Sequence, residues 1–308
     1  MPHLIRLLPL LFTLFSATAA AQSDVKIRIA FPSGMNGIYP TVMERAGIAK
    51  KHGLDAEFSF FQNGPPMMEA LAAGSVDAVV TSLMPITSFL SKQPGKAVVV
   101  AQLGYSSHSL MVPKDSTVAG LTDLKGKRIA VSFGTDSYQD LLGSLRAAGI
   151  DSAKDVKLLN TPPNELLLAL SQNFAEAIVI RQPQVQRLQQ QFGAKIVKTW
   201  PFRFLSIMRT DYLAKQPAAQ ARYLSALRES VLWTANNPEQ ASIWFGERLR
   251  LDPTIVRKIS NEDPQFTKAT NTGDIPLALS PALQKELEAW FQQSLDFGLI
   301  NTPVTLAR

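Results

Sequence analysis

The sequence has 308 residues, of which 46% are hydrophobic and none is cysteine, and its 31 lysines and arginines outnumber its 25 aspartates and glutamates. Without cysteine the chain has no disulfide bond, so its stability has to come from a buried core. The basic residues are dispersed and lack the interleaved aromatic side chains of a nucleic-acid-binding stripe. The net charge of +6 is compatible with a small anionic ligand.

The first residues have the layout of a secretory signal peptide. Arg6 precedes an apolar run at residues 7–15, and small residues lead to Ala19, Ala20 and Ala21. The run is too short for a bilayer, which takes about 20 apolar residues. We expect cleavage near Ala21 and a mature protein, residues 22–308, in the periplasm. A chain without cysteine cannot carry a lipid on cysteine, so the outer membrane of a Gram-negative cell would have to retain it.

The 308 residues less the 21 of the leader leave 287, a length that suits two lobes because single cores stop growing at about 250–300 residues. In the first part of the mature chain, apolar alternation predicts strands and proline or polar turns predict helix starts. The expected strands lie at residues 26–31, 54–61, 76–81, 97–103 and 109–112, and the expected helices at 39–52, 67–73 and from 85 onward.

The pattern restarts after a polar turn at residues 122–127. Buried strands that alternate with helices indicate a parallel α/β sheet in this part too. The expected strands lie at residues 128–133, 156–159, 175–180, 195–199 and 204–208. The expected helices lie at residues 134–148, 162–172, 183–191, 217–235, 238–249, 253–260 and 281–297, with a surface loop at 261–279.

The simplest architecture inserts the second α/β unit into the first. Lobe I would comprise residues 22–113 and 204–308, and lobe II residues 114–203. The chain would cross between the lobes twice, near Pro113 and near Arg203. Two crossings make a hinge, and a hinge that closes around a ligand is a known switching mode.

The chain resembles the substrate-binding family of ABC transporters that serves nitrate, sulfonates, taurine and thiamine-precursor pyrimidines. Four stretches carry the resemblance in order along the chain: YP at 39–40 with AKKHGL at 49–54, MEALAAGSVDA at 68–78, LKGKRIAV at 124–131 with GTDSY at 134–138, and ANNPEQA at 235–241. The resemblance implies a type II periplasmic-binding-protein fold with the ligand between two lobes. It also implies an inner-membrane permease with its ATPase as partner, and no enzymatic activity.

In that family the ligand contacts come from loops at strand ends, and open α/β sheets generally bind ligands at the carboxyl ends of their strands. The strongest local signal is Gly134, Thr135, Asp136 and Ser137, where a glycine turn opens a helix whose N-terminus favours an anion. These residues are also those of an ordinary helix cap. Asp136 would repel an anion unless it points away, or it would accept a hydrogen bond from an amine or a ring N–H of the ligand.

Arg181 follows the strand at residues 175–180, where family members often have tryptophan, an acidic residue and proline. A guanidinium suits a carboxylate or sulfonate, although Arg181 also fits a surface arginine paired with a neighbouring helix. The remaining candidates for ligand contact follow other expected strands, and each also has a bland interpretation as loop packing, turn or cap: Gly34, Met35, Asn36, Tyr39, Asn63, Ser82 and Asn160.

The sequence gives little support for catalysis. Only His52 and His108 remain in the mature chain, and motifs for a nucleophile elbow, a phosphate loop or a metal site are absent. We therefore expect a monomeric receptor without metal or cofactor. The alternatives are an enzyme or a signalling sensor on the same fold, with turnover dependent on His108 in the case of an enzyme.

The ligand is expected to be an organic anion, a sulfonate or carboxylate, with a hydrophobic body. Arg181 and the helix start favour the anion, and Met35 and Tyr39 favour the apolar part. Asp136 leaves a nitrogen heterocycle, such as a thiamine-precursor pyrimidine, open as the alternative.

Overall fold

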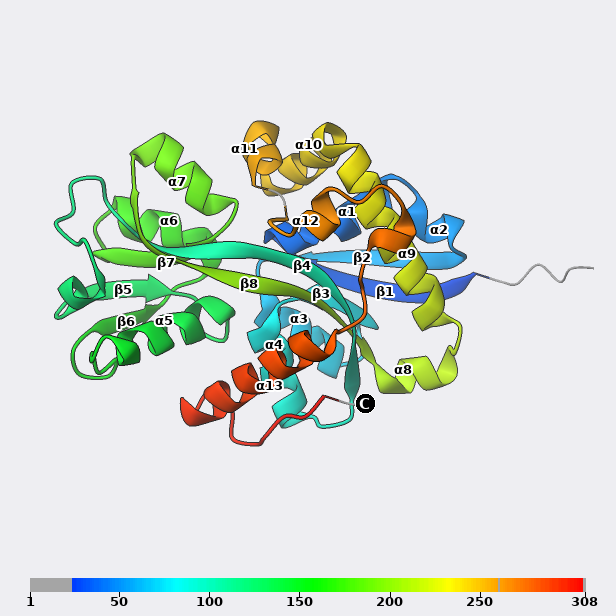
Figure 1. Ribbon diagram of the computed structural model, residues 1–308, viewed down its shortest axis with the longest axis horizontal. Coiled ribbons are helices and arrows are strands. Elements are labelled where there is room, and N and C mark those ends of the chain that lie inside the picture. The colour runs from blue at the N-terminus through cyan, green and yellow to red at the C-terminus, as the bar shows by residue number, and fades with distance from the viewer. Residues whose placement is uncertain (1–23, 260, 307–308) are drawn as a thin grey trace, which may run out of the picture.

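The structure is a computed structural model that describes residues 24–259 and 261–306 (Figure 1). The expected signal peptide lies outside the described residues. Eight strands form one mixed sheet in the order β2-β1-β3-β8-β4-β7-β5-β6, with helices on both faces. The expected α/β class is therefore confirmed. Among the described residues, no helix is both long and apolar enough to cross a membrane.

The sheet consists of two parallel halves joined by one antiparallel pair of long strands. In the first half β1 (Val25–Pro32) pairs in parallel with β2 (Leu54–Phe61) and β3 (Ala78–Thr81). In the second half β5 (Arg128–Val131) pairs in parallel with β6 (Lys157–Asn160) and β7 (Ala177–Arg181). We call the first half with its helices lobe I and the second half with its helices lobe II.

The long strands β4 (Ala97–Val112) and β8 (Lys195–Arg209) run through both lobes. They pair from Ala97 opposite Arg209 to Val112 opposite Lys195. The sequence predicted two short strands in place of each of them, which is wrong. Polar residues and Gly104 in the middle of β4 suggested a break, but the strand passes through as an irregular ladder with register shifts on both sides of Gly104.

Gly104 makes this irregularity possible. Its φ of +81° belongs to the left-handed region, and an added Cβ would lie 2.4 Å from the Asn261 Nδ2 atom. The Asn261 amide takes the place of a strand neighbour, because its Nδ2 donates to the Leu103 carbonyl (2.6 Å) and its Oδ1 accepts from the Tyr105 N–H (3.1 Å). The backbone groups that the bulge frees are therefore satisfied by a side chain from a distant segment.

That segment corrects a second expectation. The surface loop expected at residues 261–279 contains the short helices α12 (Pro264–Thr267) and η3 (Thr272–Asp274). It also buries Phe266, Ile275 and Leu277 in the core of lobe I. The sequence did not predict this burial, because many polar residues separate these three apolar residues. Their contacts are made with strands and helices far away in the sequence.

The helix expected at residues 39–52 is also divided. It consists of α1 (Ile38–Arg45) and α2 (Ile48–Lys51), which are separated at Gly47 with φ +67°. A further short helix that was not expected, α8 (Thr210–Lys215), precedes the helix expected at 217–235. The short helices η1 (Met35–Gly37) and η2 (Leu121–Leu124) were not expected. The other helices, close to their expected places, are α3 (Gly64–Ala72), α4 (Leu83–Lys92), α5 (Asp136–Ala147), α6 (Pro163–Ser171), α7 (Gln184–Phe192), α9 (Ala219–Asn236), α10 (Pro238–Leu249), α11 (Pro253–Lys258) and α13 (Pro281–Asp296).

Each half of the sheet has one apolar core on each face. In lobe I, α1, α9 and α10 cover one face and α3, α4 and α13 the other; in lobe II, α6 and α7 cover one face and α5 the other (Figure 1). Successive residues of a strand point to opposite faces. Ile178 and Ile180 of β7 therefore enter the core under α6 and α7, and Ala177 and Val179 enter the core under α5.

Candidate ligand-binding site

A cavity of about 670 Å³ lies between the two lobes. This volume is within the range of about 300–1,000 Å³ that is typical of small-molecule sites. Its wall combines the ends of β2 and α10 in lobe I, the ends of β5 and β7 with the starts of α5, α6 and α7 in lobe II, and the middle of β4 and β8. The lining residues used below are Phe60, Gln62, His108, Thr135, Asp136, Ser137, Leu168, Arg181, Arg187, Phe202, Arg248 and Arg250.

The start of α5 lies at this cavity, as the sequence predicted. Gly134 adopts φ +71°, which lets the chain turn from β5 into the helix, and Thr135 and Ser137 line the cavity. Thr135 is the N-cap residue, yet its hydroxyl donates to the Ser132 carbonyl (2.6 Å) and does not cap the helix. The N-terminus of α5 therefore has no side-chain cap from this residue, which suits an incoming anion.

Asp136 occupies the first position of α5 and is only 4% exposed. Its Oδ1 accepts a hydrogen bond from the Met84 N–H (2.7 Å), so this carboxyl group of lobe II caps the start of α4 in lobe I. Burial raises the pKa of Asp136, and hydrogen bonds from the Ser82 side chain and the Met84 N–H oppose the rise. One of its oxygens is thus already engaged by the protein.

Arg181 ends β7 and lines the cavity. Its Nη2 donates to the Gln62 carbonyl at the end of β2 (3.0 Å), so it reaches from lobe II to lobe I. A Cβ built on Gly34 would lie 3.3 Å from the Arg181 side chain, which shows how closely the loop after β1 approaches it. Burial lowers the pKa of Arg181, and the nearby Asp136 opposes that shift. Arg181 is therefore not a surface arginine that pairs with a neighbouring helix, which was the alternative interpretation.

The remaining predicted residues do not line the cavity. Met35, Asn36 and Tyr39 are buried, because the chain after β1 turns directly into η1 and α1 and packs these side chains inward. The Tyr39 hydroxyl accepts from Asn261 Nδ2 (2.8 Å), and burial raises its pKa. Ser82 precedes α4, Asn63 precedes α3, and Asn160 accepts from the Phe133 N–H (3.0 Å).

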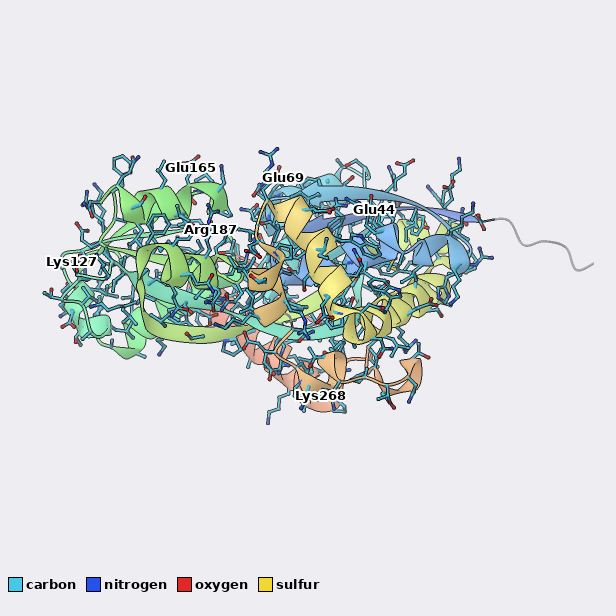
Figure 2. All side chains as sticks on the ribbon, turned by 90° about the horizontal axis from the view of Figure 1, so that it is seen from above. Glu44, Glu69, Lys127, Glu165, Arg187 and Lys268 are labelled. Carbon is cyan, nitrogen blue, oxygen red and sulfur yellow. The ribbon has the colours of Figure 1, made fainter. Side chains whose placement is uncertain are left out.

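Three arginines of the cavity wall were not predicted. Arg187 lies on α7, on the part of lobe II that faces lobe I, whereas Lys127 lies at the far end of that lobe (Figure 2). Arg248 and Arg250 lie at the end of α10, about 70 residues after Arg181 in the chain. Basic residues at a helix end are common because they suit the helix dipole. The sequence therefore offered no signal that separates Arg248 and Arg250 from ordinary surface residues.

The Arg248 guanidinium is held in place from several sides. It pairs with Glu44 of α1 and stacks over the rings of Phe31 (5.0 Å) and Phe60 (5.7 Å). Its Nε is buried and has no hydrogen-bond partner among the described residues. Glu44 therefore balances the charge of Arg248, and the guanidinium is fixed at the cavity edge.

His108 lies in the wall, and its ring centroid is 5.5 Å from that of Trp200 and 5.7 Å from that of Phe202. Its Nε2 is 3.0 Å from Asp140 Oδ2, without the alignment of a hydrogen bond. The neighbouring serines are engaged elsewhere: Ser107 donates to Glu262 (2.6 Å), and Ser109 bonds to Thr199 (2.9 Å). Within the described part of the chain, no three His, Asp or Glu side chains gather as a metal site.

This combination, two α/β lobes on one sheet with a polar cavity between them, defines a periplasmic-binding-protein fold. Residues 20–244, well over half of the chain, match the NMT1-like family, and the chain belongs to that family. A putative binding protein of Brucella abortus is 25% identical over 303 residues, covering 94% of this chain and 91% of the relative. The taurine-binding periplasmic protein of Escherichia coli is 26% identical over 262 residues, covering 77% and 78%.

Solved structures share the fold. The alkanesulfonate-binding protein SsuA from Xanthomonas axonopodis pv. citri, bound to MOPS, has a TM-score of 0.76 at 18% identity and covers 93% of this chain and 98% of its own. The periplasmic nitrate-binding protein NrtA from Synechocystis has a TM-score of 0.69 at 17% identity, with coverage of 90% and 82%. The expected relation to substrate-binding proteins of ABC transporters is thus confirmed.

Proposed function

We propose that this protein is the periplasmic solute-binding component of an ABC importer and that it captures a small organic anion, a sulfonate or carboxylate, between its lobes. The observation that carries the proposal is the charge of the cavity wall. Four arginines line it, Arg181, Arg187, Arg248 and Arg250, against the single carboxylate of Asp136. One oxygen of that carboxylate already accepts from Met84. The relatives named for sulfonates and taurine support the same ligand class.

The geometry supports a specific mode of capture. The anionic group would lie between Arg181 and the uncapped start of α5, where a guanidinium and free helix N–H groups both favour negative charge. At the edge of a protein, two opposite unit charges 4 Å apart attract by about 4 kcal/mol. The apolar body would contact Phe60, Leu168 and Phe202.

We further propose that β4 and β8 act as the hinge between lobe I, residues 22–113 and 204–308, and lobe II, residues 114–203. The bulge at Gly104 supports this because it interrupts the regular ladder in the middle of the long strands. Asp136 with Met84 and Arg181 with Gln62 connect the lobes at the cavity. Opening of the hinge would break both hydrogen bonds and expose the ligand.

The setting follows from the same proposal. The leader at residues 1–21 would direct export to the periplasm, where the monomeric protein would deliver its ligand to an inner-membrane permease and its ATPase. The ligand would leave chemically unchanged, since Ser107 and Ser109 beside His108 are engaged in hydrogen bonds to other residues. A nitrogen heterocycle is not favoured, because Asp136, which would recognise its N–H, is used as a cap for α4.

Isothermal titration calorimetry of residues 22–308 tests the ligand class. Taurine, butane-1-sulfonate, benzenesulfonate and benzoate represent organic anions, and nitrate and an aminopyrimidine represent the alternatives. We expect at least one organic anion to bind, and Arg181→Ala to weaken it by about 10-fold or more, since a hydrogen bond to a charged group contributes about 1.5–3 kcal/mol.

Arg257→Ala is the matched control, because Arg257 pairs with Glu239 on the surface and does not line the cavity. It should change the affinity by less than twofold. Binding of the aminopyrimidine alone, or an Arg181→Ala variant that binds the anion as tightly as the wild type, would overturn the proposal.

A further inference from the structure

The last turn of α10 ends in an unusual residue. Arg250 has φ +54° and ψ +48°, in the left-handed region, and follows the helix directly. The Leu251 N–H donates to the Gly246 carbonyl (2.9 Å) and the Arg250 N–H to the Glu247 carbonyl (3.2 Å). These two hydrogen bonds define a Schellman motif, in which the left-handed position strongly favours glycine because a Cβ there is strained.

Other helix ends of this chain have glycine at the left-handed position. The helices α3, α5 and α13 end in the same pair of hydrogen bonds, and their left-handed residues are Gly74, Gly149 and Gly298. The other left-handed residue that is not glycine is Asn173 after α6, and asparagine tolerates this conformation. Among the described residues, Arg250 is therefore the one case in which a long, charged side chain occupies such a cap.

No structural contact explains the exception. Within the described part of the chain, the Arg250 side chain takes part in no hydrogen bond or ion pair, but it lines the cavity between the lobes. Residues held in sparsely populated backbone conformations cluster at functional sites. The position of Arg250 thus indicates a role toward the contents of the cavity.

The charges around the cavity do not balance. Of its four arginines, Arg248 is neutralised by Glu44, and Asp136 provides one further carboxylate. Two positive charges remain after these two acids are counted against the four guanidinium groups. They come from both lobes, since Arg181 and Arg187 belong to lobe II and Arg250 to lobe I. A ligand with a single negative charge would leave one of them uncompensated.

We propose that Arg250 contacts the ligand and that the ligand is an organic dianion, with one acid group at Arg181 and the start of α5 and the second at Arg250. This rests on the proposed function and names its substrate class more narrowly. The class comprises disulfonates, sulfocarboxylates and dicarboxylates whose acid groups flank an apolar body. Arg250 would act as a specificity-determining residue that separates dianions from monoanions.

Matched pairs of probes test this by calorimetry on residues 22–308: 4-sulfobenzoate and benzene-1,4-disulfonate against benzenesulfonate, and butane-1,4-disulfonate against butane-1-sulfonate. At least one dianion should bind about 10-fold or more tightly than its monoanion, since a second ion pair of moderate strength gives such a factor. Arg250→Gly should reduce this preference to below about twofold. Arg250→Lys, which keeps the charge, should retain most of it.

The same Arg250→Gly variant separates a functional from a structural role. Because glycine suits the left-handed cap, the melting temperature should rise by about 1–2 °C while the dianion preference falls. Asn173→Gly is the matched control, since it replaces the other left-handed residue away from the cavity and should leave the preference unchanged.

The outcomes are distinguishable. Monoanions that bind as tightly as every dianion would overturn the inference and leave the proposed function standing. If no organic anion of the panel binds, both fail. An Arg250→Gly variant that keeps the preference would show that Arg250 does not select the ligand. A variant that melts at a lower temperature than the wild type would show that Arg250 supports the fold, against the inference.

Discussion

Asp136 shows how one residue can serve the cavity and the contact between the lobes. It is buried at the start of α5, and its carboxyl group caps α4 across the lobe boundary. The sequence predicted Asp136 at the site but left its role open between helix start and ligand contact. Its actual partner, the Met84 N–H, lies 52 residues away and belongs to the other lobe, and no local pattern carries that information.

The protonation of Asp136 gives a prediction about pH. Burial raises its pKa in the folded protein above the ordinary value, so the folded state holds this proton more tightly than the unfolded state. The contribution of Asp136 to stability is therefore present at low pH and is lost as the pH rises through the raised pKa. Asp136→Asn keeps an oxygen for the Met84 N–H and removes the charge.

Thermal unfolding of both proteins between pH 4 and pH 8 measures this effect. The melting temperature of Asp136→Asn relative to the wild type should increase with pH and level off above the raised pKa. The affinity for an organic anion should also increase, because a negative charge is removed from the cavity wall. A difference in melting temperature that is constant across the pH range would contradict this account of Asp136.

At the scale of elements, the two lobes use the same device at the start of a central strand. In lobe I, the Arg28 side chain and N–H both donate to the Asp77 carboxylate just before β3. In lobe II, the Arg128 side chain and N–H both donate to Glu176 just before β7. Each pair fixes a strand to its parallel neighbour. The two pairs differ in exposure, because Asp77 is 5% exposed and Glu176 is 37% exposed.

This difference predicts unequal effects of Asp77→Ala and Glu176→Ala. The first leaves Arg28 and the neighbouring Arg209 without a buried partner, and we expect a loss of about 3 kcal/mol of unfolding free energy. The second breaks a solvated pair and should cost less than about 1 kcal/mol, although Arg128 lowers the pKa of Glu176 to about 2. Urea denaturation at pH 7 measures both, and equal losses would contradict this ranking.

The contribution of the Glu176 pair to stability depends on pH in the opposite direction from that of Asp136. The pair stabilises the folded state above the ordinary pKa of a glutamate, and this stabilisation is lost as the pH falls toward the lowered pKa of about 2. Acid unfolding near pH 3 should therefore narrow the difference between the wild type and Glu176→Ala.

The elements themselves were largely predictable from the sequence. The strand β2 and the helix α10 have their expected bounds, because apolar alternation marks the strand and Pro238 marks the helix start. The sequence missed the continuity of β4 and β8, because Gly104 lies in a bulge that Asn261 completes. Local patterns indicate where a strand begins, but they do not show a side chain that closes the ladder from more than 150 residues away.

Some residues of the candidate site were predictable from the sequence and others were not. Thr135, Ser137 and Arg181 were predicted, because the end of a strand and the start of a helix are read from neighbouring residues. Arg248 and Arg250 were not, because a basic helix end has a sufficient local explanation in the helix dipole. What brings them to the cavity is the packing of α10 against α1, which only the folded chain shows.

For the whole molecule, the arrangement of charge and shape points to one activity. Two lobes on a continuous sheet flank a cavity that is rich in arginine, and the bulge in the long strands lies where the proposed hinge would bend. Asp136 and Arg181 lie near each other and both connect the lobes, so that the proposed ligand capture and the lobe contact share residues. A ligand that binds only the closed form would stabilise the folded protein through both lobes.

Thermal unfolding of residues 22–308 with an organic anion and its neutral isostere tests this claim most directly. The anions are the mono- and dianionic sulfonates and carboxylates named above, each paired with its amide or sulfonamide. After the experiment, mass spectrometry checks whether each compound is unchanged. An anion at about a hundred times its Kd should stabilise the protein by about 2.7 kcal/mol and raise the melting temperature by about 4–5 °C. The account predicts such a shift for at least one anion, none for its neutral isostere, and a compound recovered unchanged. Equal shifts for both members of each pair, no shift with any anion, or conversion of the compound would contradict it.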